Sequence, residues 1–281
     1  MTGTVFAMVL GAALLHAVWN TLVKVNADRL VMMAMMMSGQ AIIAISVLPF
    51  VAFPTPAAWP YIWASTALHS GYYLFLIMAY RYGDLSHVYP IARGSSPLIV
   101  AFVTVVFVGE ILSRQATWSV ALIALGIMSL ALTRGASGLR EPRAILFALG
   151  TGVFIAGYTI VDGLGARLAY SAHSYTFWLN AIDSIPLILV AAYLRRGQIR
   201  THAQKTWKIG MFAGVVSLIA YWIVIWAMTL APMAMVSAVR ETSMIFAVLF
   251  GVFFLKERLN LARLASTAVT LIGAVMLKTS R

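Results

Sequence analysis

Residues 92–112 of the chain read ARGSSPLIVAFVTVVFVGEIL, and residues 239–259 read VRETSMIFAVLFGVFFLKERL. The two stretches align without a gap at an offset of 147 residues, so that Arg93 falls on Arg240. Each stretch is apolar over about the 20 residues that a helix needs to cross a bilayer. An ionisable side chain at that depth is costly enough to make function its default explanation. The two arginines are therefore the first candidates for a functional site.

The composition places the chain in a membrane rather than in water. Of its 281 residues, 62% are hydrophobic and 10% are charged, whereas soluble domains are roughly half apolar. Lys and Arg total 20 against 8 Asp and Glu, but they are spread over short connecting segments, which does not indicate a nucleic-acid partner. The absence of cysteine excludes disulfide bonds and thiolate chemistry. We therefore expect the lipid bilayer to surround most of the surface.

Ten apolar runs are long enough to cross the hydrocarbon of a bilayer. Backbone groups in lipid must be paired within their own segment, so the runs predict helices and an all-α fold. The connections are too short to hold a soluble domain, and we expect the run that begins near Met1 to be the first span. The predicted spans cover residues 4–24, 30–53, 58–81, 86–108, 115–133, 143–163, 172–194, 206–230, 233–255 and 261–279.

A second internal alignment joins the starts of the two halves. HAVWNTLV at 16–23 falls on IAGYTIVD at 155–162 at an offset of 139 residues. The alignments divide the chain into five-span halves, residues 1–137 and 138–281. Because five is odd, the second half must enter the membrane in the opposite orientation. The sequence therefore predicts two inverted repeats around a central cavity, as in many secondary transporters.

The basic residues between the spans predict the orientation in the membrane. The connections after the odd-numbered spans carry thirteen Lys and Arg residues, whereas the other face carries Arg114, Arg167, Lys278 and Arg281. The face with more basic residues is expected to be cytoplasmic. Both termini then lie on the periplasmic side.

Two interpretations of Arg93 and Arg240 remain open at this point. Each side chain could snorkel to the nearer interface, or each could face a water-filled cavity and bind a carboxylate through its two-pronged guanidinium. Inversion would place the two arginines near opposite faces, where each could act in one access state. Their recurrence at matched positions favours the second interpretation.

Polar and aromatic side chains share faces on other predicted spans. His69 and Tyr73 lie on one stripe of the third span, and Tyr221 lies beside Trp222 on the eighth. Such stripes fit either helix packing or the lining of a cavity. Asp183 must find a partner or stay protonated in lipid, so pairing with an arginine and proton carriage are both open. Glu110 and Glu257 are predicted to compensate the N-terminus of the helix that follows each of them.

Three stretches carry a resemblance to a known family: LLHAVWNTLVK at 14–24, GDLSHVYPIARGSSPLIVAFVTVVFVGEIL at 83–112, and VRETSMIFAVLFGVFFLKERLNLARLASTAVTLIGAVML at 239–277. Over nearly its full length the chain resembles the EamA-type branch of the drug/metabolite transporter superfamily, in which a G-E-x-L or K-E-R-L ending recurs in both halves. The resemblance implies ten helices, inverted repeats, a central cavity and alternating access. It also implies a bacterial inner-membrane exporter of amino acids or related metabolites, similar to the aromatic amino acid exporter of that superfamily.

One departure from the superfamily bears on the cargo. Its small four-helix multidrug members use a membrane-embedded Glu in their first helix, whereas the first span here has only His16 at comparable depth. Antiport of cationic drugs is therefore in doubt, and the arginines favour a cargo with a carboxylate.

We predict a secondary transporter rather than an enzyme, acting as a monomer on a small zwitterionic molecule, with no metal or cofactor. The sequence has no phosphate-binding loop of the G-x-x-x-x-G-K-[ST] type, which excludes ATP-driven transport by this chain alone. The alternatives are a multidrug or phosphorylated-metabolite carrier, and a non-transporting receptor or intramembrane enzyme. The predicted substrate-binding residues are His16, Trp19, Asn20, His69, Tyr73, Arg93, Tyr158, Trp178, Asp183, Tyr221, Trp222 and Arg240.

Overall fold

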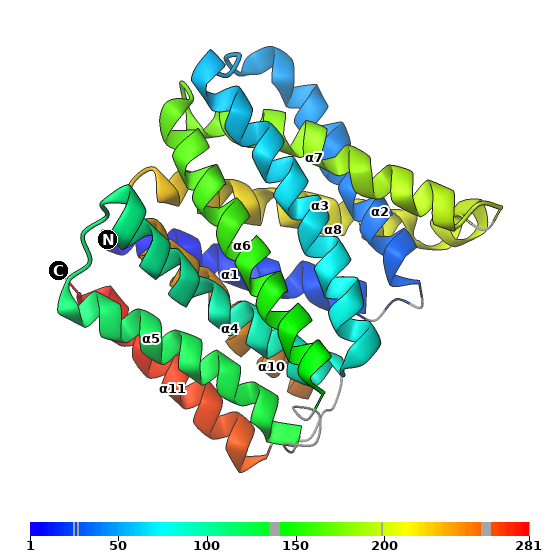
Figure 1. Ribbon diagram of the computed structural model, residues 1–281. Helices are drawn as coiled ribbons and strands as arrows, with labels where there is room; N and C mark the ends of the chain where they lie inside the picture. Colours follow the sequence, from blue (N-terminus) through cyan, green and yellow to red (C-terminus); the bar gives the residue numbers. More distant parts are fainter. Residues whose placement is uncertain (25, 27, 135–140, 198, 254–259, 281) are drawn as a thin grey trace.

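The computed structural model describes residues 1–24, 26, 28–134, 141–197, 199–253 and 260–280. Every regular element in these residues is helical (Figure 1). The long helices are α1 (Gly3–Lys24), α2 (Arg29–Val47), α3 (Trp59–Tyr82), α4 (Leu85–Val103), α5 (Arg114–Ser129), α6 (Pro142–Leu168), α7 (Ala172–Leu194), α8 (Ile199–Met228), α9 (Met233–Glu241), α10 (Ser243–Phe253) and α11 (Leu261–Thr279). Short turns of other helix types are η1 (Leu48–Phe50), η2 (Pro56–Ala58), η3 (Thr104–Val108) and η4 (Leu130–Arg134).

Nine helical segments of the described residues are long and apolar enough to cross a membrane. They coincide with nine of the predicted spans. Helix α3 lies where the third span was predicted and has 24 residues, but it is not among the nine. Its tyrosines, His69 and Arg81 lower its hydropathy. The all-α class is confirmed, and the count of ten spans stays a prediction.

Short polar side chains begin several helices by accepting the first unpaired backbone N–H groups. The Asp28 carboxylate accepts from the backbone N–H groups of Leu30 and Val31 at the start of α2. Ser113, Ser171 and Asn260 act in the same way at the starts of α5, α7 and α11. These caps mark where the four helices begin.

Helices α5 and α11 lie side by side along one edge of the molecule (Figure 1). A glycine on each helix makes the close approach possible. A Cβ atom on Gly126 would lie 2.8 Å from the backbone nitrogen of Thr270, and one on Gly273 would lie 2.9 Å from the backbone nitrogen of Ile123. Small residues allow membrane helices to pack backbone to backbone. Gly126 and Gly273 are also related by the 147-residue offset.

The packing partners are exchanged by the internal alignment. Helix α3 packs along α6, and the corresponding helix α8 packs along α1. Helix α4 packs against α6 and α9, while α1 packs against α9 and α10. The start of α1 and the end of α11 lie at the same end of the molecule, at the left of Figure 1. A chain that crosses the membrane an even number of times has both of its ends on the same side.

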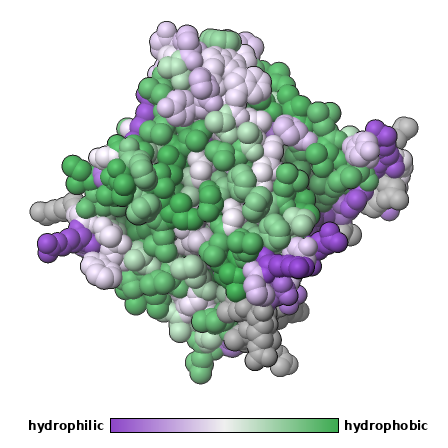
Figure 2. Space-filling view, viewed as in Figure 1, coloured by the Kyte–Doolittle hydropathy of each residue, from purple (hydrophilic) through white to green (hydrophobic). Residues whose placement is uncertain are grey.

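The outer surface is apolar around its middle. Figure 2 shows apolar residues over most of the visible face and hydrophilic residues near its margins. Leu74 and Ile77 of α3 and Leu146 and Val153 of α6 all expose more than half of their surface. Exposed large side chains of this kind on neighbouring helices match a lipid-facing surface.

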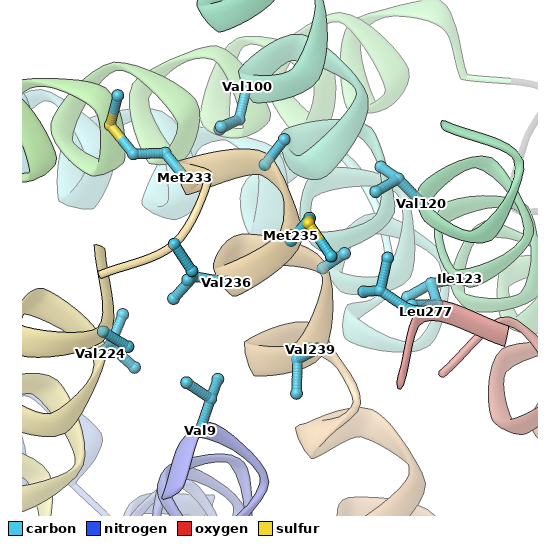
Figure 3. Close-up of a cluster of buried hydrophobic side chains, with 14 of the residues drawn as sticks. Val9, Val100, Val120, Ile123, Val224, Met233, Met235, Val236, Val239 and Leu277 are labelled. Atoms are coloured by element: carbon cyan, nitrogen blue, oxygen red, sulfur yellow. The ribbon is translucent and has the colours of Figure 1, made fainter. Parts of the chain in front are cut away.

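The short helix α9 lies inside the molecule, and all nine of its residues are buried. Around it lie Val9 of α1, Val100 of α4, Val224 of α8 and Leu277 of α11 (Figure 3). Such an enclosure on every side requires the helix to be apolar all round. The last residue of α9, the acidic Glu241, is therefore an exception that needs an explanation.

The predicted ninth span, 233–255, is interrupted in the structure. Helix α9 ends at Glu241 and α10 begins at Ser243, with Thr242 between them. The Thr242 hydroxyl donates to the carbonyl oxygen of Val239 at 2.6 Å, and a hydroxyl bonded back to its own helix often bends it. The acidic residue at the end of α9, Glu241, therefore lies within the predicted span and not at one of its ends.

Candidate binding site

A cavity of about 720 Å³ extends into the molecule from one end of the bundle. Lys24, Arg29 and Asp84 line it near that end, where α1 finishes and α2 and α4 begin. Its inner part is lined by Asn20, Tyr89 and Ser243, and we call this part the floor of the cavity. The volume is typical of a site for a small molecule.

Aromatic side chains cover much of the cavity wall. Trp19, Tyr72, Tyr73, Tyr80 and Tyr89 all line it, and the rings of Tyr72 and Tyr73 lie 5.0 Å apart. The indole nitrogen of Trp19 is buried without a hydrogen-bond partner among the described residues. The wall can therefore hold an apolar body, with the indole N–H of Trp19 buried behind its surface.

Beneath the floor lies a buried ionic cluster of Arg93, Arg240 and Glu241. Arg93 Nε lies 2.8 Å from Glu241 Oε2, close enough for an ion pair although the pair does not meet the geometry of a hydrogen bond. Arg240 donates to Glu241 Oε1 from its Nε at 3.1 Å and from Nη2 at 3.0 Å. The three residues are at most 3% exposed. We call these residues the arginine–glutamate cluster.

Neighbouring helices contact the Nη2 atom of each guanidinium group. Arg93 Nη2 donates to Ser243 Oγ at 3.3 Å and lies 2.5 Å from His16 Nε2. A guanidinium has no acceptor, so His16 must accept at Nε2 and carry its proton on Nδ1. Arg240 Nη2 donates to Thr159 Oγ1 at 3.3 Å. The cluster thus joins α1, α4, α6, α9 and α10.

Aromatic rings extend the contacts of the cluster in two directions. The Arg93 guanidinium lies 5.5 Å from the ring centre of Tyr89, which lines the cavity. Arg240 lies 5.9 Å from the ring centre of Tyr158. Cations over aromatic faces at this distance are stabilised by the ring quadrupole. Arg93 is therefore the arginine nearer to the cavity through its described contacts.

The prediction that Arg93 and Arg240 act near opposite faces is wrong for this structure. Both arginines reach the same carboxylate, because α9 ends in the middle of the molecule and presents Glu241 between them. At 3% and 2% exposure, the side chains do not snorkel to an interface. Neither arginine is among the described lining residues of the cavity; Ser243 and Tyr89 separate it from Arg93.

A second polar group surrounds His69, whose ring stacks on that of Tyr158 at 4.0 Å. The His69 Nδ1 atom lies 3.9 Å from Asp183 Oδ1. The fully buried Asp162 accepts from the hydroxyls of Tyr175, at 2.9 Å, and Tyr221. Tyr158 lies between this group and Arg240. Four of the predicted residues, His69, Tyr158, Asp183 and Tyr221, therefore come together here.

The remaining predicted residues occupy different places. Trp19, Asn20 and Tyr73 line the cavity, and His16 contacts Arg93. Trp178 packs with Phe53 and Trp59, and Trp222 donates its indole N–H to His173. These last two tryptophans are not among the described lining residues of the cavity. The described ion pairs do not join Asp183 to an arginine; its carboxylate lies near His69 instead, and proton carriage stays a prediction.

The opposite end of the bundle is tied together by Glu110 and Arg167. Their ion pair measures 2.7 Å, and Glu110 also accepts from the backbone N–H of Met233 at 2.9 Å. Arg167 Nε donates to the carbonyl oxygen of Met228 at 2.9 Å. Glu110 thus compensates the N-terminus of α9, whereas Ser113 caps the following helix α5. The predicted helix for Glu110 was wrong, and Glu257 lies outside the described residues.

The most important residue that the sequence reasoning missed is Glu241. It is the only acidic residue between Met233 and Phe253, and it directly follows Arg240. The rule that singled out the arginines, an ionisable side chain within an apolar run, applies equally to this carboxylate. In the described residues, no three His, Asp or Glu side chains gather as metal ligands would.

The helical bundle and its apolar girdle indicate an integral membrane protein, and the cavity beside the buried charges is its candidate small-molecule site. Residues 142–279 match the EamA-like transporter family, which confirms the resemblance to the drug/metabolite transporter superfamily. The second part of the chain is thus an EamA-like transporter domain, and it indicates an integral membrane protein that transports small molecules.

A solved structure titled "Crystal structure of protein" is similar to the chain, with a TM-score of 0.77 and 16% sequence identity. The similarity covers 99% of this chain and 99% of that one. At this identity it concerns the fold alone. No curated protein matches the sequence.

Proposed function

We propose that the protein is a secondary transporter of amino acids or related small carboxylates, working by alternating access between two inverted five-helix repeats, residues 1–137 and 138–281. The exchanged packing partners of α1, α3, α6 and α8 support the repeats. The lipid-type surface of α3 and the position of both chain ends at one end of the bundle support a tenth pass.

The observation that carries the cargo assignment is the position of the cavity floor over the arginine–glutamate cluster. Ser243 lines the cavity and also accepts a hydrogen bond from Arg93. The positive charge beneath this floor attracts a carboxylate, while the aromatic wall accommodates an apolar body. The ammonium group of an amino acid can lie against the rings of Tyr72 and Tyr73, because aromatic faces attract cations.

The basic residues of the cavity support an orientation for the proposed state. Lys24, Arg29 and Arg263 line the cavity with Asp84. Basic residues at the ends of spans favour the cytoplasmic face, so the cavity would open toward the cytoplasm and both termini would lie in the periplasm of a bacterial inner membrane. The same basic residues favour a second candidate, a carrier of phosphorylated metabolites.

Flux in liposomes tests this proposal. Purified protein should move radiolabelled L-phenylalanine, and Arg93→Gln should lower the initial rate at least about tenfold, because it leaves Glu241 with one arginine fewer and removes the charge under the floor. Arg93→Lys should not restore the rate, since an ammonium cannot reproduce the planar contacts to Glu241 and Ser243. The exposed Arg114 offers a matched control, and Arg114→Gln should transport normally.

Competition in the same vesicles separates the two cargo classes. Excess amino acids should abolish labelled uptake, whereas phosphate esters should not. Uptake by Arg93→Gln equal to that of the unaltered protein would remove the arginine from the mechanism. Specific binding without any flux in vesicles would instead support a receptor.

A further inference from the structure

The arginine–glutamate cluster holds an odd number of charges. Arg93 and Arg240 contribute two positive charges, and Glu241 contributes one negative charge. His16 accepts a hydrogen bond from Arg93 and is therefore neutral. Among these contacting groups one positive charge is left without a partner. Buried charges are normally paired because an unpaired one is costly, so the cluster lacks one negative charge.

The floor of the cavity offers a place for that negative charge. Ser243 Oγ accepts from Arg93, which leaves its own hydroxyl proton available to a ligand. Trp19 lines the same cavity, with its indole N–H buried in the wall. An anionic group bound here would complete a network of two guanidinium groups and two anions.

We propose that Glu241 sets the charge of the cargo: it cancels one of the two arginine charges, so that the site accepts a group with one negative charge and discriminates against a group with two. The proposal rests on the proposed transport of small carboxylates and specifies it further. A single carboxylate balances the remaining charge of Arg93. A phosphate monoester carries almost two negative charges above pH 7 and would leave one buried charge unbalanced.

Three probes with the same phenyl body separate charge from shape. Benzoate and benzenesulfonate carry one negative charge, whereas phenyl phosphate at pH 8 carries about two. Benzenesulfonate matches the tetrahedral head of phenyl phosphate, so a preference between these two reports charge. A unit charge about 6 Å away in a partly buried site changes an equilibrium on the order of 100-fold. Dissociation constants can be obtained from thermal-shift titrations in detergent, because a bound ligand stabilises the folded protein.

Variants of the cluster change its net charge in steps of one. The unaltered protein has one net positive charge, and Arg240→Gln has none. Glu241→Gln has two, and the double variant Arg240→Gln with Glu241→Gln returns to one. We expect the unaltered protein and the double variant to prefer benzenesulfonate, Glu241→Gln to shift the ratio toward phenyl phosphate by about tenfold to 100-fold, and Arg240→Gln to bind all three probes weakly.

A control variant tests whether the loss of any carboxylate has the same effect. Glu141→Gln removes an exposed carboxylate at the start of α6 and should leave the ratio unchanged. If Glu241→Gln does not fold, the contrast between Arg240→Gln and the double variant still tests the charge rule, because only the second restores the net charge. The proposal is overturned if the ratio of benzenesulfonate to phenyl phosphate affinity is equal in the unaltered protein and the three variants, or if the unaltered protein binds none of the probes.

The outcome for Glu241 is independent of the outcome for transport. L-phenylalanine flux in vesicles together with an unchanged binding ratio in Glu241→Gln would refute the role of Glu241 and leave the transport function standing. A shifted ratio without flux of any carboxylate would support the charge rule and refute the transport function.

Discussion

Glu241 holds two arginines that lie 147 residues apart in the sequence. A carboxylate shared by two guanidinium groups lowers the cost of burying all three charges, because each arginine faces the opposite charge at hydrogen-bonding distance. Removing Glu241 would leave two buried guanidinium groups without an anion, and breaking a buried ion pair in this way typically costs about 3–5 kcal/mol. The same residues that define the site therefore also stabilise the middle of the molecule.

At the periphery, Asp28 gives a pH-dependent contribution to stability. Partial burial alone raises the pKa of Asp28, but the hydrogen bond from Arg195 and those from the backbone N–H groups of Leu30 and Val31 outweigh it, so the pKa lies below its ordinary value. A carboxyl with a lowered pKa in the folded state stabilises the fold above the pKa of the unfolded state. This contribution disappears as the pH falls through the lowered value.

We expect Asp28→Asn to lower the free energy of unfolding by about 0.5–1 kcal/mol at pH 7, because the ion pair with Arg195 is lost while asparagine still caps α2. The difference from the unaltered protein should begin to shrink below about pH 4, the ordinary pKa of the unfolded carboxyl, and vanish once the pH is below the lowered pKa of the folded protein. Thermal unfolding in detergent from pH 3 to pH 8 measures this. A difference that is constant over the whole range would contradict the assignment.

At the scale of elements, the α5–α11 contact depends on two glycines. A Cβ atom on Gly126 would meet the Thr270 hydroxyl as well as the backbone nitrogen of the same residue at 2.8 Å. The hydroxyl can rotate away, but the backbone cannot. Helices that pack this closely must separate to accept even one methyl group.

We expect Gly126→Ala to destabilise the folded protein by about 1–3 kcal/mol through overpacking. Gly11 on α1 has nothing within 4 Å of a built Cβ atom, so Gly11→Ala should be neutral or slightly stabilising, since alanine favours helix formation. The two variants have the same change of side chain and differ only in their surroundings. Equal melting temperatures would show that the α5–α11 contact is looser than described.

On the scale of the whole molecule, the cavity and the Glu110–Arg167 ion pair lie toward opposite ends of α4 and of the broken helix α9–α10. Asp84 and Gly251 line the cavity, while the backbone N–H of Met233 donates to the Glu110 carboxylate at the other end. In an alternating-access cycle the closed end must open. The ion pair and its hydrogen bonds must then break.

We expect Glu110→Gln to shift the population toward the state that is open at this end. The chain has no cysteine, so a single reporter can be placed at the fully buried Ser65. Labelling of Ser65→Cys by a soluble maleimide should become about fivefold faster when Glu110→Gln is added. This factor corresponds to a loss of about 1 kcal/mol from the free energy that favours the closed state of this end. A second reporter in the cavity, Ala247→Cys, should be labelled more slowly in the same background.

Glu141→Gln is the control for this measurement, since it removes a carboxylate elsewhere and should change neither labelling rate. If Glu110→Gln speeds the labelling of both reporters equally, the ion pair contributes general stability rather than closure of one end.

The sequence alone determined the class of fold and the positions of the helices. Apolar runs of sufficient length can satisfy their backbone groups only as helices in lipid, and this reasoning located the long helices, including α3, but not the break between α9 and α10. It also selected Arg93 and Arg240, because a buried charge stands out in an apolar run. Glu241, next to Arg240, carries the same signal of an ionisable side chain in an apolar run, but the sequence analysis did not select it.

Only the tertiary structure decided which of these side chains meet. Helical periodicity groups residues on one face of one helix, but it does not say which face of another helix lies opposite. The convergence of both arginines on Glu241 and the capping of α9 by Glu110 depend on contacts between helices that are distant in the sequence. Their physical cause is packing in three dimensions, which fixes the rotation and depth of every helix at once.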